Sequence, residues 1–253
     1  MKICIATGTR AEYGLLKPLI GKINADDNFT LQLLVTGAHL SPEFGLTYRQ
    51  IEADGYEIDA KVEMLLSSDT AEGITKSMGL GMIGYAGALK RLAPDLLVIL
   101  GDRYEMLAVA STALIFRIPI AHIHGGELTE GAYDDAIRHA ITKMSALHFT
   151  STEAYRQRVI QLGEQPERVF NVGAIGLDNF QSLQLLSKRE LEEDLHITFN
   201  RFNYLVGFHP ETLSDQSVEE QFEALLQAID NQTDSFFVFP SDSELESFLL
   251  QER

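Results

Sequence analysis

Short apolar runs alternate with longer amphipathic segments along most of the chain. The runs typical of buried strands are residues 2–7, 29–37, 56–65, 94–102, 118–123, 146–151 and 168–173. The intervening segments with helical spacing are residues 12–25, 41–55, 69–91, 105–117, 132–145 and 152–163. Strands that alternate with helices in this way predict a parallel sheet covered on both faces. We therefore expect an α/β fold in which residues 1–175 form a Rossmann-like, doubly wound domain.

Two helix starts in this domain carry recognisable capping signals. Ser41 followed by Pro42 predicts that a helix begins there, because proline is favoured at the first helical position. Asp69, with Glu72 three residues later, resembles a capping arrangement for the helix that ends near residue 91.

The pattern of strands and helices restarts after residue 175. The charged segment 187–201 precedes a strand-like run at 203–210, and Ser217 with Glu220 forms a capping box for a helix over 218–230. The sequence predicts a further strand over 235–240 and a short helix over 243–253. Residues 176–253 are thus expected to form an incomplete second α/β domain, since two strands are too few for a stable doubly wound sheet. Uncovered apolar surface on such a sheet favours self-association.

Composition excludes several classes of function. The chain has 37 acidic residues against 20 Lys and Arg, a formal charge of −17, which argues against binding to nucleic acid or to an anionic membrane. The single cysteine, Cys4, lies in an apolar run and excludes an internal disulfide or a multi-cysteine metal site. The sequence shows neither a secretory leader nor a long apolar span, so we expect a cytoplasmic protein.

Polar residues follow several of the expected strands. Gly8 and Arg10 come after the first strand, where an arginine and a helix N-terminus could approach a phosphate, although the Gly-x-Gly-x-x-Gly signature of dinucleotide binding is absent. His39 follows the second strand. Asp102 ends the strand 94–102 and Arg103 follows it, where open α/β sheets place functional groups, although Asp102 could equally cap the next helix.

The densest polar cluster lies in residues 122–141. His122 and His124 alternate at the end of a strand and should face opposite sides, and the glycine pair that follows allows a sharp turn before Glu127. Several ionisable groups beyond neighbouring strand ends would perturb each other's pKa, as a general acid–base site requires.

The helix after this cluster begins with Asp134 and Asp135. Acidic residues are favoured in a first helical turn, and Asp134 and Arg138 could form an ordinary surface ion pair, so a structural explanation also exists. A metal site has weak support because the sequence has no paired histidines at helical spacing, and a Gly-x-Ser-x-Gly nucleophile turn is absent. We therefore expect acid–base chemistry without a metal or cofactor.

Five segments together resemble the hydrolysing UDP-N-acetylglucosamine 2-epimerases of sialic-acid biosynthesis. In chain order they are GTRAEYGLL, TGAHLSPEFG, GDRYEMLA, HIHGGELTEGAYDDAIRHAITKMSALHFTSTEAY and GFHPET, and the long middle segment is the most specific. The resemblance extends to about residue 230. It implies a two-domain GT-B-like fold with UDP between the domains, and conversion of UDP-N-acetylglucosamine and water to N-acetylmannosamine and UDP. It leaves open related UDP-sugars, and we expect a homo-oligomer, a dimer or a tetramer.

The resemblance also implies roles for individual residues. Elimination of UDP and hydration of the resulting glycal need acid–base groups at the sugar and cations at the diphosphate. The matching acid–base positions are Asp102, His124 or Glu127, Asp134, Asp135 and His209. The matching positions expected to bind substrate are Arg10, His39, Arg103 and Arg138. The family's non-hydrolysing branch often has Glu at the position of His124, so either His124 or Glu127 fills that role.

One departure from the family pattern concerns the C-terminal part. Family members usually continue further, through a small-residue stretch that holds the phosphates, and this chain has no such stretch. Two interpretations follow: an epimerase whose second domain is incomplete, or an inactive or partner-dependent fragment that only binds a UDP-sugar or another chain.

Overall fold

A computed structural model describes residues 1–178, 185–208, 217–232 and 235–238. The chain divides into two compact units. The first comprises Met1–Glu130 and Asp134–Ser182, and the second comprises Gly131–Tyr133 and Leu183–Arg253.

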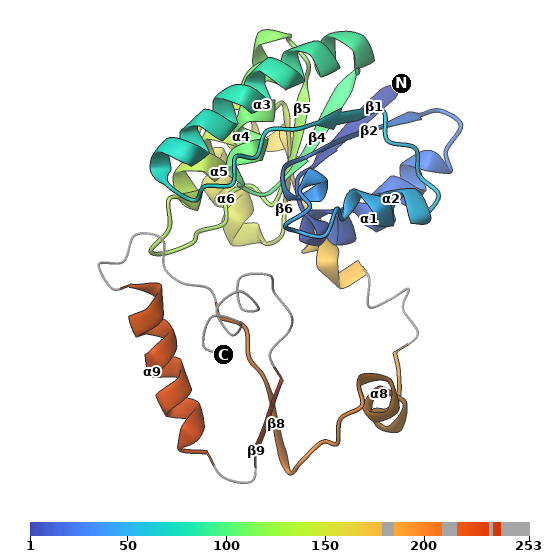
Figure 1. Cartoon of the computed structure of the whole chain (residues 1–253). Coiled ribbons are helices and arrows are strands. Elements are labelled where there is room, and N and C mark those ends of the chain that lie inside the picture. Colours follow the sequence, from blue (N-terminus) through green and yellow to red (C-terminus); the bar gives the residue numbers. More distant parts are fainter. Residues whose placement is uncertain (179–184, 209–216, 233–234, 239–253) are drawn as a thin grey trace. The chain divides into compact units, whose positions relative to one another are not determined.

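The first unit is built on a seven-stranded sheet in which every neighbouring pair of strands is parallel. The strands are β1 Lys2–Thr7, β2 Thr30–Thr36, β3 Ala60–Val62, β4 Leu96–Leu100, β5 Ile120–Ile123, β6 Leu147–Thr150 and β7 Val169–Asn171. Their order is β3-β2-β1-β4-β5-β6-β7 (Figure 1). The predicted α/β fold with a Rossmann-like parallel sheet is therefore confirmed, and every expected strand of this unit is present.

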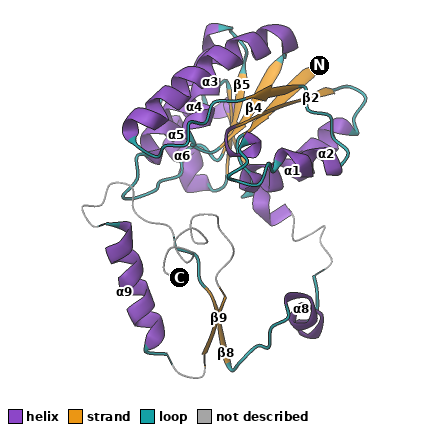
Figure 2. Cartoon of the chain, in the orientation of Figure 1, coloured by secondary structure: helices purple, strands orange, loops and turns teal. Residues whose placement is uncertain are grey.

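Helices connect successive strands. They are α1 Arg10–Asn24, α2 Tyr48–Ala53, α3 Ala71–Leu92, α4 Tyr104–Ile115, α5 Asp134–Met144 and α6 Glu153–Gln161, as the purple ribbons of Figure 2 show. Short 3₁₀ turns occupy Gly37–Leu40, Pro166–Arg168 and Ile175–Leu177. None of the helices in the described part of the chain is long and apolar enough to cross a membrane.

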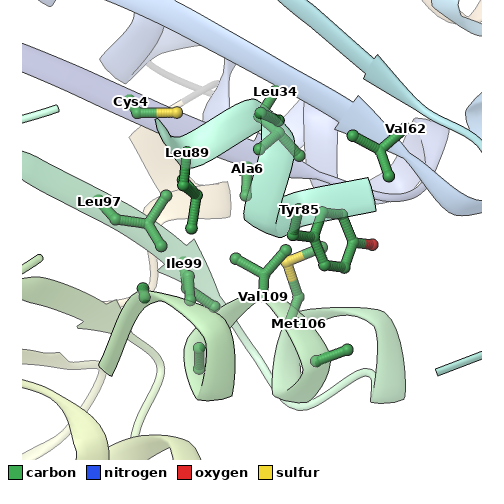
Figure 3. Close-up of a cluster of buried hydrophobic side chains, with 14 of the residues drawn as sticks. Cys4, Ala6, Leu34, Val62, Tyr85, Leu89, Leu97, Ile99, Met106 and Val109 are labelled. Atoms are coloured by element: carbon green, nitrogen blue, oxygen red, sulfur yellow. The ribbon is translucent and has the colours of Figure 1, made fainter. Parts of the chain in front are cut away.

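Apolar side chains cover the sheet on both faces. Alternate residues of β1 point to opposite sides, so that Ile3 and Ile5 join one core cluster while Cys4 and Ala6 join the other. The second cluster also contains residues from α3, α4 and α5, and Figure 3 shows Tyr85 of α3 within it. The Tyr85 hydroxyl lies 2.8 Å from Thr36 Oγ1, which satisfies both buried groups.

Two predicted helix starts differ from the structure. The helix expected from Ser41 begins only at Tyr48, because Gly45 and Leu46 have φ values of 78° and 51°, in the left-handed region that interrupts a helix. Ser41 instead ends the preceding 3₁₀ turn. Helix α3 is capped by Thr70 rather than Asp69: the Thr70 hydroxyl accepts the Gly73 N–H. The cap is thus the threonine one residue later, and the prediction that Asp69 caps this helix is wrong.

The second unit contains two parallel strands and two helices among its described residues. They are α8 Lys188–Leu195, β8 Phe202–Leu205, α9 Val218–Asp230 and β9 Ser235–Val238. The predicted capping box of Ser217 and Glu220 is present at the start of α9. The helix expected over residues 243–253 lies outside the described residues. Leu205 of β8 is 77% exposed, so one apolar position of this small sheet is uncovered.

All carboxyl ends of the first unit's strands meet at one edge of the sheet because the strands are parallel. The chain order reverses between β1 and β4, and parallel α/β sheets bind ligands at this kind of switch point. The segments that follow β1, β4, β5 and β6 therefore decide what the first unit can do.

Candidate active site

Asp102 and Arg138 form a buried ion pair at this edge of the sheet. Asp102 follows β4, and its Oδ2 accepts a hydrogen bond from Nη2 of Arg138 on α5. The two side chains are 18% and 8% exposed. Burial raises the pKa of the Asp102 carboxyl, the charge of Arg138 opposes that rise, and the nearby carboxylates of Asp134 and Glu127 add to it. Asp102 is thus a carboxylate that takes up a proton more readily than an exposed aspartate.

Arg138 has donor capacity beyond this pair. Its Nη2 also lies 3.3 Å from Thr129 Oγ1, and its Nη1 lies 3.9 Å from Asp135 Oδ1. Within the described part of the chain, its buried Nε and Nη1 atoms form no hydrogen bond. Buried donors are normally satisfied, so these two N–H groups suit an incoming oxygen-rich ligand.

Asp134 and Asp135 open α5 but make different contacts. Asp135 Oδ1 accepts the backbone N–H of Thr129 at 2.7 Å, which fastens the preceding loop to the start of the helix. Asp134 lies close enough to Asp102 to raise the pKa of that carboxyl. The alternative explanation, a surface ion pair between Asp134 and Arg138, is not what the structure has: Arg138 is buried and pairs with Asp102 at the strand end.

His124 follows β5 in a conformation that is unusual for a residue with a side chain. Its φ is 64°, in the left-handed region, and such strain is found preferentially at functional sites. Its Nε2 accepts the backbone N–H of Ile175 at 3.4 Å, and its Nδ1 lies 3.6 Å from Glu127 Oε1. Burial lowers the pKa of His124, while the Glu127 carboxylate works in the opposite direction. Burial therefore favours the neutral imidazole.

A residue at the end of the neighbouring strand β6 fixes the side chain of Glu127. The Ser151 hydroxyl, just after β6, donates to Glu127 Oε1 at 2.5 Å. Arg158 of α6 donates to the carbonyl oxygen of Gly126, which fixes the loop immediately before Glu127. Among the described residues, the other oxygen of Glu127, Oε2, forms no hydrogen bond, and the side chain is partly exposed, so this oxygen can meet a ligand.

His122 has a structural role on the other side of β5. Its ring is fully buried, with Nε2 2.7 Å from the carbonyl oxygen of Gly101 and Nδ1 3.1 Å from Thr142 Oγ1. The carbonyl can only accept, so Nε2 carries the proton and Nδ1 accepts from the threonine. Burial lowers the pKa of His122 to about 3, so the ring stays neutral and links the residue before Asp102 to α5.

His39 is fully buried and lies between two hydroxyl groups. Its Nε2 is 3.1 Å from Thr7 Oγ1 and its Nδ1 is 2.8 Å from Thr47 Oγ1. Burial lowers its pKa to about 4. Both ring nitrogens are thus engaged within the chain, and the ring joins the end of β1 to the start of α2.

The turn between β1 and α1 carries a buried carboxylate of its own. Glu12 Oε2 accepts the backbone N–H groups of Gly8 and Thr9 at 2.6 and 3.2 Å, as part of a capping box. Burial raises the pKa of Glu12 to about 7, against the effect of these N–H groups and of Arg103. The carboxylate of Glu12 therefore occupies the N-terminus of α1, where a phosphate could otherwise bind.

The two remaining arginines of the predicted set differ in their surroundings. Arg10, the first residue of α1, is exposed. Arg103 binds Glu105 through two hydrogen bonds, Nε to Oε2 at 3.2 Å and Nη2 to Oε1 at 3.1 Å. The Glu105 side chain has no exposed surface, so Arg103 neutralises a buried charge while remaining 44% exposed itself.

The structure thus brings five predicted residues into one cluster beyond β4 and β5, namely Asp102, His124, Glu127, Asp134 and Arg138, with Asp135 at its border. It places His39, Arg103 and Arg10 on the β1 side of the switch point, and His209 lies outside the described residues. The described residues contain no group of three or more metal-binding side chains arranged to hold a metal ion.

Sequence reasoning missed the supporting residues Ser151, Arg158 and Thr129. Ser151 ends the run 146–151 at the carboxyl end of a strand, and this position was a usable signal. Arg158 lies within a helix and Thr129 within a loop, and their contacts depend on packing that the pattern does not reveal.

Comparisons with known proteins place the chain in a family. The family model described as UDP-N-acetylglucosamine 2-epimerase matches residues 21–250. The chain is 44% identical, over 98% of its length, to a GDP/UDP-N,N'-diacetylbacillosamine 2-epimerase (hydrolyzing) from Campylobacter jejuni, and 41% identical, over its full length, to the polysialic acid biosynthesis protein P7 of Escherichia coli. It spans 65% of the length of each of these relatives.

Solved structures show the same fold. A UDP-GlcNAc 2-epimerase from Neisseria meningitidis bound to UDP-GlcNAc superimposes with a TM-score of 0.79 and 19% identity, over 95% of this chain and 66% of that one. The Methanocaldococcus jannaschii UDP-GlcNAc 2-epimerase in complex with UDP-GlcNAc and UDP gives a TM-score of 0.75 and 20% identity, over all of this chain and 70% of that one.

The loop before Glu127 should tolerate only glycine at position 126. Gly126 and Gly173 both have φ of 82°. A Cβ added at position 126 would lie 2.5 Å from the Tyr155 carbonyl oxygen, whereas a Cβ added at position 173 would have no neighbouring atom within 4 Å. Gly126→Ala should therefore lower the free energy of unfolding by about 1–3 kcal/mol more than Gly173→Ala, because both share the backbone strain and only the first clashes. Urea denaturation measures the difference, and equal losses would contradict the described packing against α6.

Glu12 should make stability depend on pH. Its pKa is higher in the folded state than in the unfolded chain, so the folded state retains a proton that the unfolded state releases between about pH 4.5 and 7. The resulting stabilisation is complete below this window and is lost as the pH rises through it, by at most about 1.4 kcal/mol per pH unit. Glu12→Gln should remove this loss relative to the wild type.

All other titratable groups are shared by the wild type and Glu12→Gln, so the difference between their unfolding free energies isolates Glu12. Glu57→Gln, at an exposed position, serves as the control and should follow the wild-type curve. Parallel curves for Glu12→Gln and the wild type from pH 5 to 8 would contradict the raised pKa.

Proposed function

Because this chain belongs to the UDP-N-acetylglucosamine 2-epimerase family, we propose that it acts on a UDP-linked 2-acetamido sugar at the edge of its parallel sheet. In this reaction the C2 proton is removed, its electron pair forms a double bond between C1 and C2, the bond between C1 and the diphosphate oxygen breaks, and UDP leaves behind a glycal. Water then adds to the glycal, its hydroxyl to C1 and its proton to the opposite face of C2. The products are the C2-inverted free sugar and UDP.

The main observation that supports this proposal is the buried ion pair of Asp102 and Arg138, which lies close to the carboxylates of Glu127 and Asp134. The reaction needs a group that exchanges a proton with carbon or with a leaving oxygen near neutral pH. Asp102 suits that role because burial and the neighbouring carboxylates raise its pKa. The two nitrogen atoms of Arg138 that form no hydrogen bond within the described part of the chain suit the oxygens of the sugar or the diphosphate.

The described contacts favour Glu127 over His124 as the second reacting group. Both ring nitrogens of His124 are directed at other groups of the chain, the Ile175 N–H and the Glu127 carboxylate. Glu127 has one oxygen fixed by Ser151 and a second available to the sugar. We therefore assign proton transfer to Asp102 and Glu127, with His124 holding Glu127 in place. The catalytic role of Asp134 rests on its proximity to Asp102, and Asp135 acts by anchoring the loop.

Cations near the switch point would take up the charge of the departing diphosphate. Arg103 is fixed by Glu105 and partly exposed, and Arg10 is exposed at the start of α1. Glu12 already fills the α1 N-terminus, so the diphosphate would contact these side chains rather than the backbone of the turn. His209 remains a proposed contribution from the second unit. The steps move protons and break one C–O bond, and they need no redox cofactor.

Relatives differ in the sugar that their names state. Two, from Campylobacter jejuni and Legionella pneumophila, are named for N,N'-diacetylbacillosamine, and another from Neisseria meningitidis is named UDP-N-acetylglucosamine 2-epimerase, at 32% identity. We propose a UDP-2-acetamido sugar as the substrate class, with UDP-N-acetylglucosamine and UDP-N,N'-diacetylbacillosamine as the two compounds to compare.

A second function is binding of the UDP-sugar without turnover. It is favoured by the small second sheet, which has two strands among the described residues. In that case the carboxylates are in place but the sugar nucleotide is held too loosely for elimination, and another chain completes the site.

Replacement of the Asp102 carboxyl should abolish turnover. The chain is incubated with each UDP-sugar in deuterated water, and proton NMR follows free UDP and deuterium at C2 of the product. Asp102→Asn should reduce the rate by at least about 100-fold, because it removes a proton-transferring group. Asp27→Asn, at an exposed position, is the control and should keep the wild-type rate.

Turnover that survives Asp102→Asn would overturn the assignment of Asp102. Saturable binding of a UDP-sugar with no release of UDP would support the binding-only function. Absence of both binding and turnover would count against either function for this chain.

Ser151 should affect the rate by positioning Glu127. Ser151→Ala removes the hydroxyl that fixes Glu127 Oε1, and loss of a hydrogen bond to a charged group should lower kcat by about tenfold or more while leaving KM almost unchanged. Ser151→Thr retains the hydroxyl and should restore most of the rate. A change in KM alone, or equal effects of both substitutions, would contradict this role.

A further inference from the structure

Three charged side chains from two segments meet at the switch point between β1 and β4. Glu12 lies in the first turn of α1, whereas Arg103 and Glu105 lie where β4 passes into α4. An atom at the Cβ position of Gly8 would lie 3.4 Å from Glu12 Oε2 and 3.8 Å from Glu105 Cβ. The two glutamate side chains therefore converge on Gly8, just after β1.

One guanidinium group serves these two carboxyl groups. Arg103 donates two hydrogen bonds to Glu105, whose side chain has no exposed surface. Burial raises the pKa of Glu12 to about 7, and Arg103 opposes this rise while Glu105 adds to it. A single cation cannot compensate two buried negative charges, so Glu12 is the carboxyl group that takes up a proton.

The two oxygens of Glu12 differ in their surroundings. Oε2 accepts the backbone N–H groups of Gly8 and Thr9. Oε1 is buried and forms no hydrogen bond within the described part of the chain. A negative charge on such an atom is costly, whereas a neutral carboxyl group largely avoids that cost. The surroundings of Oε1 therefore fit the protonated form of Glu12.

The other ionisable groups around Glu12 keep a constant charge near neutral pH. Burial raises the pKa of the Tyr85 hydroxyl on α3, and burial lowers the pKa of His39, in the 3₁₀ turn after β2, to about 4. Strand β2 and the 3₁₀ turn after β7, which also contact α1, carry no ionisable side chain. In β1, Lys2 lies at the opposite end of the strand, and burial raises the pKa of Cys4 to about 12. Glu12 is therefore the group of this cluster whose charge changes near neutral pH.

Arg103 retains donors for a ligand. Its Nε and Nη2 atoms bind Glu105, and the side chain is 44% exposed. Among the described residues, its Nη1 atom forms no hydrogen bond. A guanidinium group that is fixed along one edge by a carboxylate presents its other edge in a defined direction, and phosphate oxygens bind well to such an edge.

We infer that Glu105 orients the Arg103 guanidinium toward the diphosphate of the UDP-sugar, and that a negative charge on Glu12 weakens this contact. The inference rests on the function proposed above. An ionised Glu12 competes with the diphosphate for the charge of Arg103 and also repels the diphosphate, so binding is tightest while Glu12 holds its proton. By linkage, a bound diphosphate opposes ionisation of Glu12, so binding near neutral pH takes up part of a proton. Both glutamates thus act through Arg103 as positioning residues.

The pH dependence of KM tests the part played by Glu12. A UDP-sugar is a suitable ligand because both of its phosphates are esterified and its charge stays constant near neutral pH. The wild-type KM should rise several-fold, and at most about tenfold, more than the KM of Glu12→Gln between about pH 6 and 8, because the amide imitates the neutral acid. Glu57→Gln, at an exposed position, is the control and should follow the wild type. The kcat values of Glu12→Gln and the wild type should remain similar, which a general loss of structure would not allow.

Titration calorimetry measures the proton directly. UDP-N-acetylglucosamine is titrated at neutral pH in buffers of different ionisation enthalpy, and both proteins carry Asp102→Asn so that the sugar is not consumed. The protein with Glu12 should take up a fraction of a proton more per bound ligand than the protein with Glu12→Gln.

A double-mutant cycle tests the part played by Glu105. Glu105→Gln removes the charged acceptor, and Arg103→Lys removes the paired donors, so each should raise KM by about tenfold or more with a smaller change in kcat. The double variant should be little worse than either single variant, because both substitutions remove the same interaction. Circular dichroism melting checks that each variant folds. If Glu105→Gln does not fold, the comparison of Glu12→Gln with the wild type still decides.

Three outcomes would count against these roles. Equal pH dependence of KM in the wild type and Glu12→Gln would overturn the inference and leave the proposed function intact. Fully independent effects of Glu105→Gln and Arg103→Lys on KM would do the same. Absence of both binding and turnover of any UDP-sugar would overturn the proposed function and this inference together.

Discussion

The ion pair between Asp102 and Arg138 connects the end of the central strand β4 to helix α5, and the site around it depends on that connection. Removing both charges from water costs several kcal/mol per ion, and only close pairing offsets this cost. Arg138 therefore has to face the strand end, and α5 has to lie where its side chain can reach Asp102. The loop before α5 is held in turn by Thr129, which contacts both Arg138 and Asp135.

Two buried histidines stay neutral and connect neighbouring segments around the Asp102–Arg138 pair. His122 and His39 each use both ring nitrogens within the chain, and burial lowers the pKa of each well below its ordinary value. Histidines held neutral in this way add no charge to the site. His124 differs, because it combines a strained backbone with a contact to the Glu127 carboxylate.

Much of the first unit could be predicted from the sequence because its strands are continuous apolar runs. Cys4 and Ala6 face one core while Ile3 and Ile5 face the other, a pattern that only a doubly covered strand explains. The clustering of Asp102, His124 and Glu127 follows from the neighbouring positions of β4 and β5 in the sheet. The contact of Arg158 could not be predicted, since it depends on how α6 packs beside the loop at Gly126.

The strand order has a consequence for synthesis of the chain on the ribosome. Strand β1 pairs with β2 on one side and with β4 on the other, yet β4 begins 34 residues after the end of β3. At the usual elongation rates, β1 waits roughly 2–7 s with one hydrogen-bonding edge unpaired after the three N-terminal strands have emerged. During that interval the nascent chain presents an apolar strand edge that pairs readily with other strands, so chaperone binding would matter most while α3 is being made.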